Sequence, residues 1–192
     1  MRGITTDAFV IKNINLKDAD KMFTILTPQK GKISALAKGV RKINSRRAGN
    51  LDTLNKISVQ LNKSKGDMYY ITEAKALKTY QNIKKDYTKI QKATYIIEFI
   101  NKAIFGEEEA QEAFDLLEEV LDKLESNGVN SSLVINKFEL KMLKYLGYEP
   151  PKSILLSWKG FVKEKKFEDA DRVVKNFVRE MIQEDFKSLE IQ

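Results

Sequence analysis

The spacing of apolar residues changes part-way along this chain, and the change limits the fold more than any other feature. Up to about residue 74, apolar side chains alternate in short runs separated by Gly, Pro and Asn, a pattern typical of β-strands. From about residue 88 they recur at intervals of three and four, as on amphipathic helices. The change predicts an α+β chain, with a strand-rich domain over residues 1–78 and an α-helical domain over residues 79–192.

The first part is expected to form five short strands. They are Thr6–Lys12, Met22–Leu26, Lys32–Ala37, Leu54–Leu61 and Asp67–Thr72. Turn residues such as Pro28, Gly31 and Gly66 lie between some of these runs, as hairpin connections require. Five strands in about 70 residues indicate a five-stranded barrel or a small sandwich.

The second part is expected to form four helices. They run through Ile90–Ile104, from after Gly106 to Asn127, from Asn130 to Gly147, and through Asp169–Ile182. The acidic triplet Glu107–Glu109 is expected at the positive N-terminal end of the second helix. Pro150-Pro151 is expected to exclude a helix from the segment that follows. Its aromatic residues, Trp158 and Phe161, are then either plugs of a small core or exposed on a loop.

The chain contains no His and no Cys. This composition excludes thiol nucleophiles, disulfides, zinc sites built from Cys or His, and every triad or proton relay that uses His. No apolar run approaches the roughly 20 residues that span a bilayer, and the first residues do not form a signal peptide. We therefore expect a soluble, cytoplasmic protein that holds no cofactor or metal and binds no membrane.

Positive charge is concentrated in the first part of the chain. Residues 1–80 hold 16 Lys and Arg against 6 Asp and Glu, whereas residues 81–192 hold 18 against 21. No acidic residue lies between Asp20 and Asp52, a window that contains eight cations. Such a window is either an ordinary solvated face or a surface that binds a polyanion, since phosphates would relieve the mutual repulsion of the cations.

The densest part of this window is Lys38–Arg47, where five of ten residues are cationic. Gly39, Asn44 and Ser45 predict a loop that leaves a strand and offers backbone N–H groups to phosphate. Small barrels hold single-stranded nucleic acid with loops of this kind and with aromatic side chains on neighbouring strands. Tyr69 and Tyr70 are the candidates for base stacking; because strands alternate, one of them should face the core.

Two further patterns have both a functional and an ordinary explanation. Lys137, Lys141 and Lys144 share one face of the third helix, which either docks an acidic peptide or is simply solvated. Asp18 and Asp20 are the candidate ligands if the chain were a metal-dependent nuclease, although solvated loop acids explain them equally well. The chain has no Walker A, Rossmann or Ser-Xaa-Xaa-Lys motif, so a binding protein is favoured over an enzyme.

Several segments resemble the bacterial recombination mediator family RecO. They are Val10-Ile11-Lys12, Lys17–Pro28 (KDADKMFTILTP), Gly31–Lys42 (GKISALAKGVRK), Ser45-Arg46, Leu51, Leu54, Thr72-Glu73-Ala74 and Tyr145–Pro150 (YLGYEP). The resemblance covers residues 4–80 well and residues 88–150 loosely. It differs at Lys17-Asp18, where Gly-Glu is expected. Many members also carry a four-cysteine zinc module after the Leu-Gly-Tyr segment, which a chain without Cys cannot form.

The resemblance implies an OB-fold followed by a helical domain without a zinc module. It implies a non-enzymatic, nucleoid-associated protein that binds single- and double-stranded DNA, anneals complementary strands and helps to load recombinase onto DNA coated by single-strand-binding protein, with RecR as a partner. The DNA contacts that it implies are Lys38, Arg41, Lys42, Arg46 and Arg47, supported by Lys32. The three helical lysines are the candidate site for the acidic tail of single-strand-binding protein. An RNA- or ribosome-associated OB-fold protein is the alternative.

Overall fold

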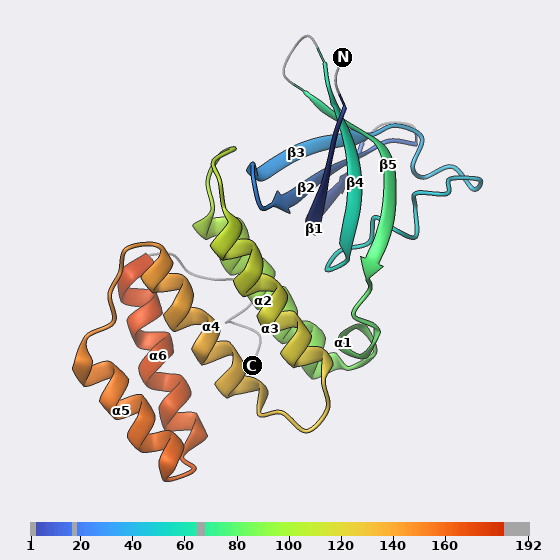
Figure 1. Cartoon of the computed structure of the whole chain (residues 1–192). Helices are drawn as coiled ribbons and strands as arrows, with labels where there is room; N and C mark the ends of the chain where they lie inside the picture. The colour runs from blue at the N-terminus through green and yellow to red at the C-terminus, as the bar shows by residue number, and fades with distance from the viewer. Residues whose placement is uncertain (1–2, 17–18, 65–67, 183–192) are drawn as a thin grey trace. The chain divides into compact units, whose positions relative to one another are not determined.

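A computed structural model describes residues 3–16, 19–64 and 68–182. The first part of the chain forms a closed barrel of five strands (Figure 1). The strands are β1 (Ile4–Asn15), β2 (Lys21–Thr27), β3 (Gly31–Ala37), β4 (Lys56–Lys63) and β5 (Tyr69–Lys78). Their order around the barrel is β1-β2-β3-β5-β4, with β3 and β5 parallel and the other pairs antiparallel. This is the Greek-key topology of an OB-fold, so the predicted five-stranded OB-fold barrel followed by helices is confirmed.

The barrel closes around alternating apolar side chains. On β2, for example, Phe23 and Ile25 are buried, while Met22 and Thr24 between and beside them are only partly covered. Strand β5 continues six residues beyond the predicted end at Thr72. Small inward residues, Ala74 and Ala76, alternate there with exposed polar ones, and this weak contrast in hydrophobicity hides the strand from a pattern search.

A segment from the second half of the chain belongs to the barrel. Contacts divide the chain into one unit of Met1–Tyr80 with Ile104–Phe114, and a second unit of Gln81–Ala103 with Asp115–Gln192. Lys32 donates its backbone N–H to Gly106 at 3.0 Å, and Ala110 donates to Pro28 at 2.8 Å. The single division expected at residue 78 stays a prediction, and the structure adds that Ile104–Phe114 packs with the strands.

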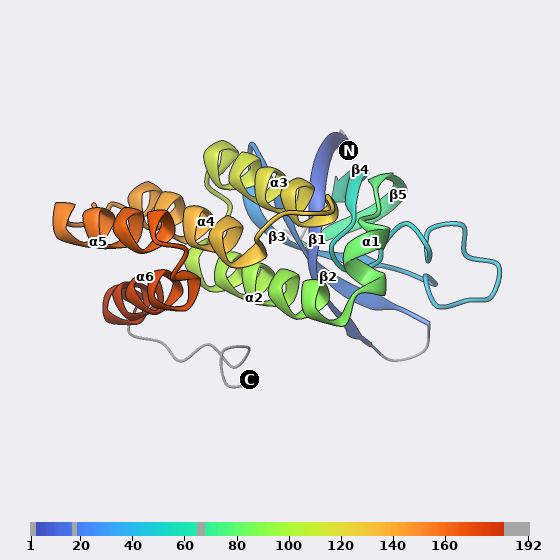
Figure 2. The same cartoon turned by 90° about the horizontal axis from the view of Figure 1, so that it is seen from below.

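The remaining chain is helical. The helices are α1 (Gln81–Lys85), α2 (Tyr87–Ala103), α3 (Gln111–Glu125), α4 (Ser131–Tyr145), α5 (Lys152–Lys163) and α6 (Phe167–Ile182). Asn130 caps α4, its side chain accepting the backbone N–H of Leu133 at 3.2 Å. Helices α5 and α6 lie side by side, as Figure 2 shows. Among the described residues, no helix is both long and apolar enough to cross a membrane.

Two expectations about the helices are wrong. Glu107–Glu109 lie in the connection before α3, whose first turn contains Glu112 instead. Pro150-Pro151 starts a helix rather than excluding one: Pro151 is the N-cap of α5. The first turn of a helix has no intrahelical partners for its N–H groups, so proline costs nothing there. Trp158 and Phe161 therefore lie on a helix, each partly buried.

Candidate nucleic-acid interface

The basic segment forms a loop that connects β3 to β4, drawn in light blue in Figure 2, where it projects beyond the strands. It begins at Gly39, whose φ of +64° suits a residue without a side chain. The N–H of Gly39 donates to the Asp20 carboxylate at 2.6 Å, and the N–H of Arg41 donates to the carbonyl of Ala19 at 2.9 Å. The start of the loop is thus held against the residues that precede β2.

Arg47 holds the second half of the loop in place. Its guanidinium donates to the carbonyl of Ile71 on β5 at 2.5 Å and to the carbonyl of Lys38 at 2.7 Å. These two bonds join the end of β3, the loop and β5. The sequence-based expectation was that Arg47 contacts phosphate, but much of its hydrogen-bonding capacity is spent inside the protein.

Asn50 is a second brace, and nothing in the sequence pattern pointed to it. Its side-chain amide donates to the carbonyls of Arg46 at 3.1 Å and Ala74 at 3.0 Å, and its carbonyl oxygen accepts the N–H of Ala76 at 3.3 Å. Short polar side chains in loops commonly make such bonds to the backbone. The only sequence signal was therefore an Asn within a loop, which does not reveal its partner.

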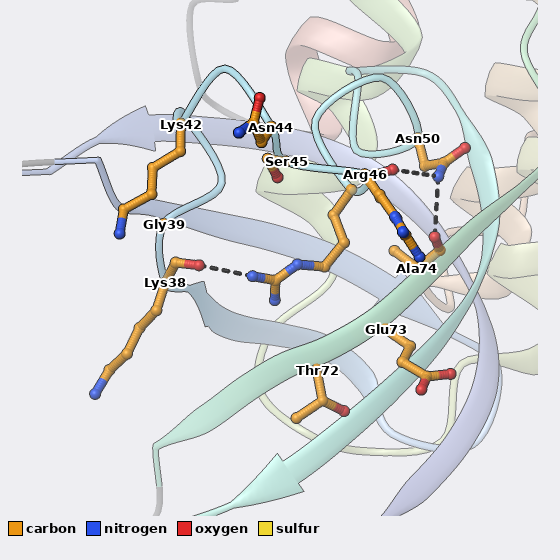
Figure 3. Close-up of a pocket in the computed structure, with 11 residues that line it drawn as sticks. Lys38, Gly39, Lys42, Asn44, Ser45, Arg46, Asn50, Thr72, Glu73 and Ala74 are labelled. Atoms are coloured by element: carbon orange, nitrogen blue, oxygen red, sulfur yellow. Dashed lines mark hydrogen bonds between the residues drawn. The ribbon is translucent and has the colours of Figure 1, made fainter.

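The braced loop and β5 enclose an open hollow of about 680 Å³. The side chains and backbone that line it come from both elements: Lys38, Gly39, Lys42, Asn44, Ser45, Arg46, Arg47, Asn50, Thr72, Glu73 and Ala74. Figure 3 shows Lys38 and Lys42 extending to the same side of the loop, with Thr72 and Glu73 on the strand below. The hollow therefore has a cationic rim and one carboxylate on its floor.

The hydroxyl of Ser45 stands out within this lining. Among the described residues, it is the buried side-chain polar atom that has no hydrogen-bond partner. A buried hydroxyl without a hydrogen-bond partner destabilises the folded state unless a ligand or a water molecule bonds to it. The sequence marked Ser45 as a loop residue and as part of the resemblance, but it did not indicate that the hydroxyl is buried without a partner.

The predicted cations do not all come together. Lys38, Lys42, Arg46 and Arg47 line the hollow, whereas Arg41 lies outside it. Lys32 stands near the opposite end of β3 from Lys38, a separation of about 20 Å along the strand. Its amino group lies 5.4 Å from the centre of the Phe105 ring, and burial lowers its pKa. Lys32 is thus not part of the cluster.

The two candidate stacking residues differ as strand alternation requires. Tyr69 is 2 % exposed and its hydroxyl donates to Glu107 at 3.0 Å, so Tyr69 is the one of the pair that faces the core. Tyr70 is partly exposed, and the Lys38 amino group lies 5.1 Å from the centre of its ring. This cation–π contact places Tyr70 beside the basic loop. Tyr70 is therefore the remaining candidate for base stacking.

Comparison with known sequences assigns this chain to a protein family. The chain matches two family models: "Recombination protein O N terminal" over residues 1–80, and "Recombination protein O C terminal" over residues 84–153. The chain belongs to the RecO family. The similar proteins are named "DNA repair protein RecO". The one from Thermoanaerobacter sp. (strain X514) is 29 % identical over 150 residues, covering 78 % of this chain and 60 % of the relative. The one from Syntrophomonas wolfei is 32 % identical over 143 residues, covering 74 % and 56 %.

This RecO-family chain spans about 60 % of the length of the curated relatives that it matches. The matched stretch contains both the barrel and the loop Lys38–Arg47. It ends near the beginning of α5, since the second family model stops at residue 153. The first family model thus covers every residue that lines the hollow.

The helical lysines that the RecO resemblance marked for an acidic peptide are only partly gathered. Lys137 and Lys141 line a narrow groove between α3 and α4, together with Lys123 and apolar residues such as Val120 and Phe138. Lys141 donates to Glu119 at 2.6 Å, and Lys123 also pairs with Glu119. Hydrogen bonds from Lys123 and Lys141 lower the pKa of Glu119. Lys144 lies outside this groove and pairs with Glu149 at 3.7 Å.

The two carboxylates that a metal-dependent nuclease would use, Asp18 and Asp20, are not described as a metal site. Asp18 lies outside the described residues, and Asp20 accepts the N–H of Gly39. Within the described part of the chain, no three His, Cys, Asp or Glu residues gather as metal ligands. The carboxylate of Asp20 instead has a structural role in the basic loop.

Proposed function

We propose that this RecO-family chain is a DNA-repair and recombination mediator that binds single- and double-stranded DNA in the hollow between the basic loop and β5. The observation that carries the proposal is the rim of Lys38, Lys42 and Arg46 on one open hollow. Phosphate groups supply the negative charge that these cations lack. The names of the relatives agree with a role in DNA repair.

Strand annealing follows from the same surface. Contacts to the backbone leave base edges free to pair and carry no sequence preference. A cationic surface that holds two strands also reduces their repulsion and raises their local concentration. In this proposal the protein has no catalytic step; it assists recombinase loading by bringing strands together on DNA coated by single-strand-binding protein.

The partners belong to the proposal as well. The groove of Lys123, Lys137 and Lys141 combines cations with apolar neighbours, which suits an acidic peptide such as the tail of single-strand-binding protein. Glu119 pairs with Lys123 and Lys141, so a peptide carboxylate would have to replace it at these two lysines. RecR is the second proposed partner, for which no surface is assigned.

The first experiment measures annealing of two labelled complementary DNA strands and its dependence on salt. The double variant Lys42→Ala/Arg46→Ala removes two rim cations and leaves the Arg47 brace intact. Its charge-matched control is Lys12→Ala/Lys30→Ala, at positions on β1 and in the turn between β2 and β3 that do not line the hollow. If four to eight phosphates are neutralised, the logarithm of the binding constant on single strands should fall with the logarithm of salt at a slope of about −3 to −6.

We expect the rim variant to lose annealing and to show a shallower salt slope, while the control behaves as wild type. A flat salt response in wild type would remove the phosphate argument. Binding to RNA strands of the same sequence distinguishes the DNA-repair proposal from the alternative. An RNA-associated OB-fold protein would bind the RNA strands more tightly than the DNA strands. Stable annealed product in Mg²⁺ speaks against a nuclease.

A further inference from the structure

The tip of the basic loop carries an apolar side chain that the proposed phosphate contacts do not explain. Ile43 is 103 % exposed, more than any other large apolar residue among those described. It stands between Lys42 and Asn44, within the window that has no acidic residue from Asp20 to Asp52. Covering a fully exposed β-branched side chain with any apolar surface lowers the free energy of the system.

The loop presents Ile43 in a defined position. The N–H of Ser45 donates to the carbonyl of Lys42 at 2.9 Å, which places Ile43 at the first central position of a turn. The preceding turn closes in the same way, with the N–H of Lys42 donating to Gly39 at 3.1 Å. Arg47 then fastens the loop to β5. Because the backbone is already ordered, little conformational entropy is lost when the tip is covered.

The surroundings of Ile43 decide what can cover it. Lys42 is its neighbour in sequence, and Arg41 and Arg46 lie two and three residues away. An apolar protein partner would have to bury these charges, which is costly without matched carboxylates. Nucleic acid offers the matching pattern, since each step between apolar base faces is flanked by phosphates. Proteins that distort DNA insert apolar side chains between bases in this way.

We propose that Ile43 inserts between adjacent bases of bound DNA and unstacks that step, so that the loop Lys38–Arg47 acts as a wedge. The inference rests on the proposed binding of DNA in the hollow. There, Lys42 and Arg46 hold the phosphates on either side of the opened step, and the hydroxyl of Ser45 lies in the adjacent lining. An unstacked base exposes its pairing edge, which favours encounter with a complementary strand and opposes competing hairpins.

The test uses DNA strands that contain 2-aminopurine, whose fluorescence rises when the base is unstacked. The strands are titrated with the full chain as wild type, Ile43→Ser and Ile43→Leu. Ile14→Ser is the matched control, because Ile14 is 50 % exposed but lies on β1, outside the segment Lys38–Arg47. Affinity is measured on the same strands by anisotropy, so that binding and unstacking are read separately.

We expect wild type and Ile14→Ser to raise the 2-aminopurine emission. Ile43→Ser should lose most of that rise yet change the dissociation constant by less than about threefold, since phosphates supply most of the affinity. Ile43→Leu should keep the rise, because it restores an apolar wedge. An undiminished rise in Ile43→Ser, or an equal loss in Ile14→Ser, overturns the wedge.

Other outcomes separate this inference from the proposed function. If wild type binds DNA without any rise in emission, the wedge is wrong and the phosphate surface stands. If wild type binds no DNA, both fail. Sedimentation with vesicles that contain anionic lipid supplies the last arm: capture that depends on Ile43, in a protein that does not unstack DNA, would assign the tip to a membrane surface instead.

Discussion

At the scale of single residues, the two neighbouring arginines of the loop have different roles. Arg47 donates to the carbonyls of Ile71 and Lys38, whereas the guanidinium of Arg46 borders the hollow. Charge density along the sequence identified both as cations of one cluster. It could not separate them, because Ile71, whose carbonyl accepts from Arg47, lies 24 residues along the chain on β5. Only the closed barrel brings these groups together.

The different contacts of Arg46 and Arg47 predict that alanine affects a different property at each position. Arg47→Ala should lower the free energy of unfolding by roughly 1–3 kcal/mol, because two carbonyls lose a charged donor. Arg46→Ala should change it by less than about 0.5 kcal/mol and weaken DNA binding instead. Urea unfolding followed by circular dichroism measures the first effect and anisotropy the second. Equal destabilisation by both variants would contradict the assigned roles.

Glu73 is the acidic residue in a lining that is otherwise neutral or cationic. Its carboxylate repels phosphates that approach the rim, so we expect Glu73→Gln to bind single-stranded DNA roughly two- to threefold more tightly at low salt. The gain should shrink at high salt, where such repulsion is screened. Anisotropy titrations at two salt concentrations check both statements, with Glu108→Gln as the control outside the hollow. Unchanged affinity would mean that phosphates do not approach this floor.

At the scale of elements, the turn between β2 and β3 depends on one glycine. Gly31 has a φ of +53°, and a Cβ built there would lie 2.4 Å from the backbone carbonyl oxygen of Glu108. The segment Ile104–Phe114 can approach the barrel this closely because no side chain intervenes. The sequence indicated a turn at Gly31, but the segment that packs on it is far along the chain and left no local sign.

Gly31→Ala should therefore destabilise the barrel. A positive φ for Ala and displacement of a backbone carbonyl together should cost about 2 kcal/mol or more. Gly49→Ala is the matched control, because a Cβ there meets nothing within 4 Å, and it should be neutral or slightly stabilising. Thermal unfolding followed by circular dichroism compares the two. Similar midpoints would show that the segment does not pack closely on the turn.

The elements that the sequence predicted, and those that it did not, differ in their apolar pattern. Strands with alternating large residues, such as β2 and β3, are found within a residue or two of the expected bounds. Helix α5 was missed because two prolines precede it and because none of its residues is buried. It is held by contacts with other helices: Trp158 donates its indole N–H to the side chain of Asn136 on α4 at 3.2 Å.

At the scale of the whole molecule, positive charge is concentrated in the part of the chain that forms the five strands. The sequence did not indicate the polar network inside the helical unit. Glu139 on α4 is fully buried and accepts the hydroxyl of Tyr95 on α2 at 2.5 Å. Asn136 donates to Glu139 at 3.3 Å and to Asp171 on α6 at 2.9 Å. Helical spacing predicts which positions face inward, but not that a carboxyl group occupies one of them.

This network makes the stability of the helical unit depend on pH. Burial raises the pKa of Glu139 from 4.5 to about 7, and the nearby Asp171 adds to the rise, although hydrogen bonds from Tyr95 and Asn136 oppose it. The folded chain thus keeps this proton at pH values where the unfolded chain releases it. The stabilising contribution is fully present below about pH 4.5 and is lost as the pH rises to about 7.

The loss should amount to roughly 3 kcal/mol between the two pKa values, beyond which the difference stays constant. Glu139→Gln cannot ionise, so its free energy of unfolding should fall less steeply over that pH range than that of wild type. Urea unfolding at half-unit steps of pH, followed by the fluorescence of Trp158 beside the network, measures the two slopes in the unit that holds the group. Exposed Glu149→Gln serves as the control and should follow wild type. Parallel profiles for Glu139→Gln and wild type would mean that Glu139 is already ionised in the folded chain at low pH, with its charge satisfied by Tyr95 and Asn136.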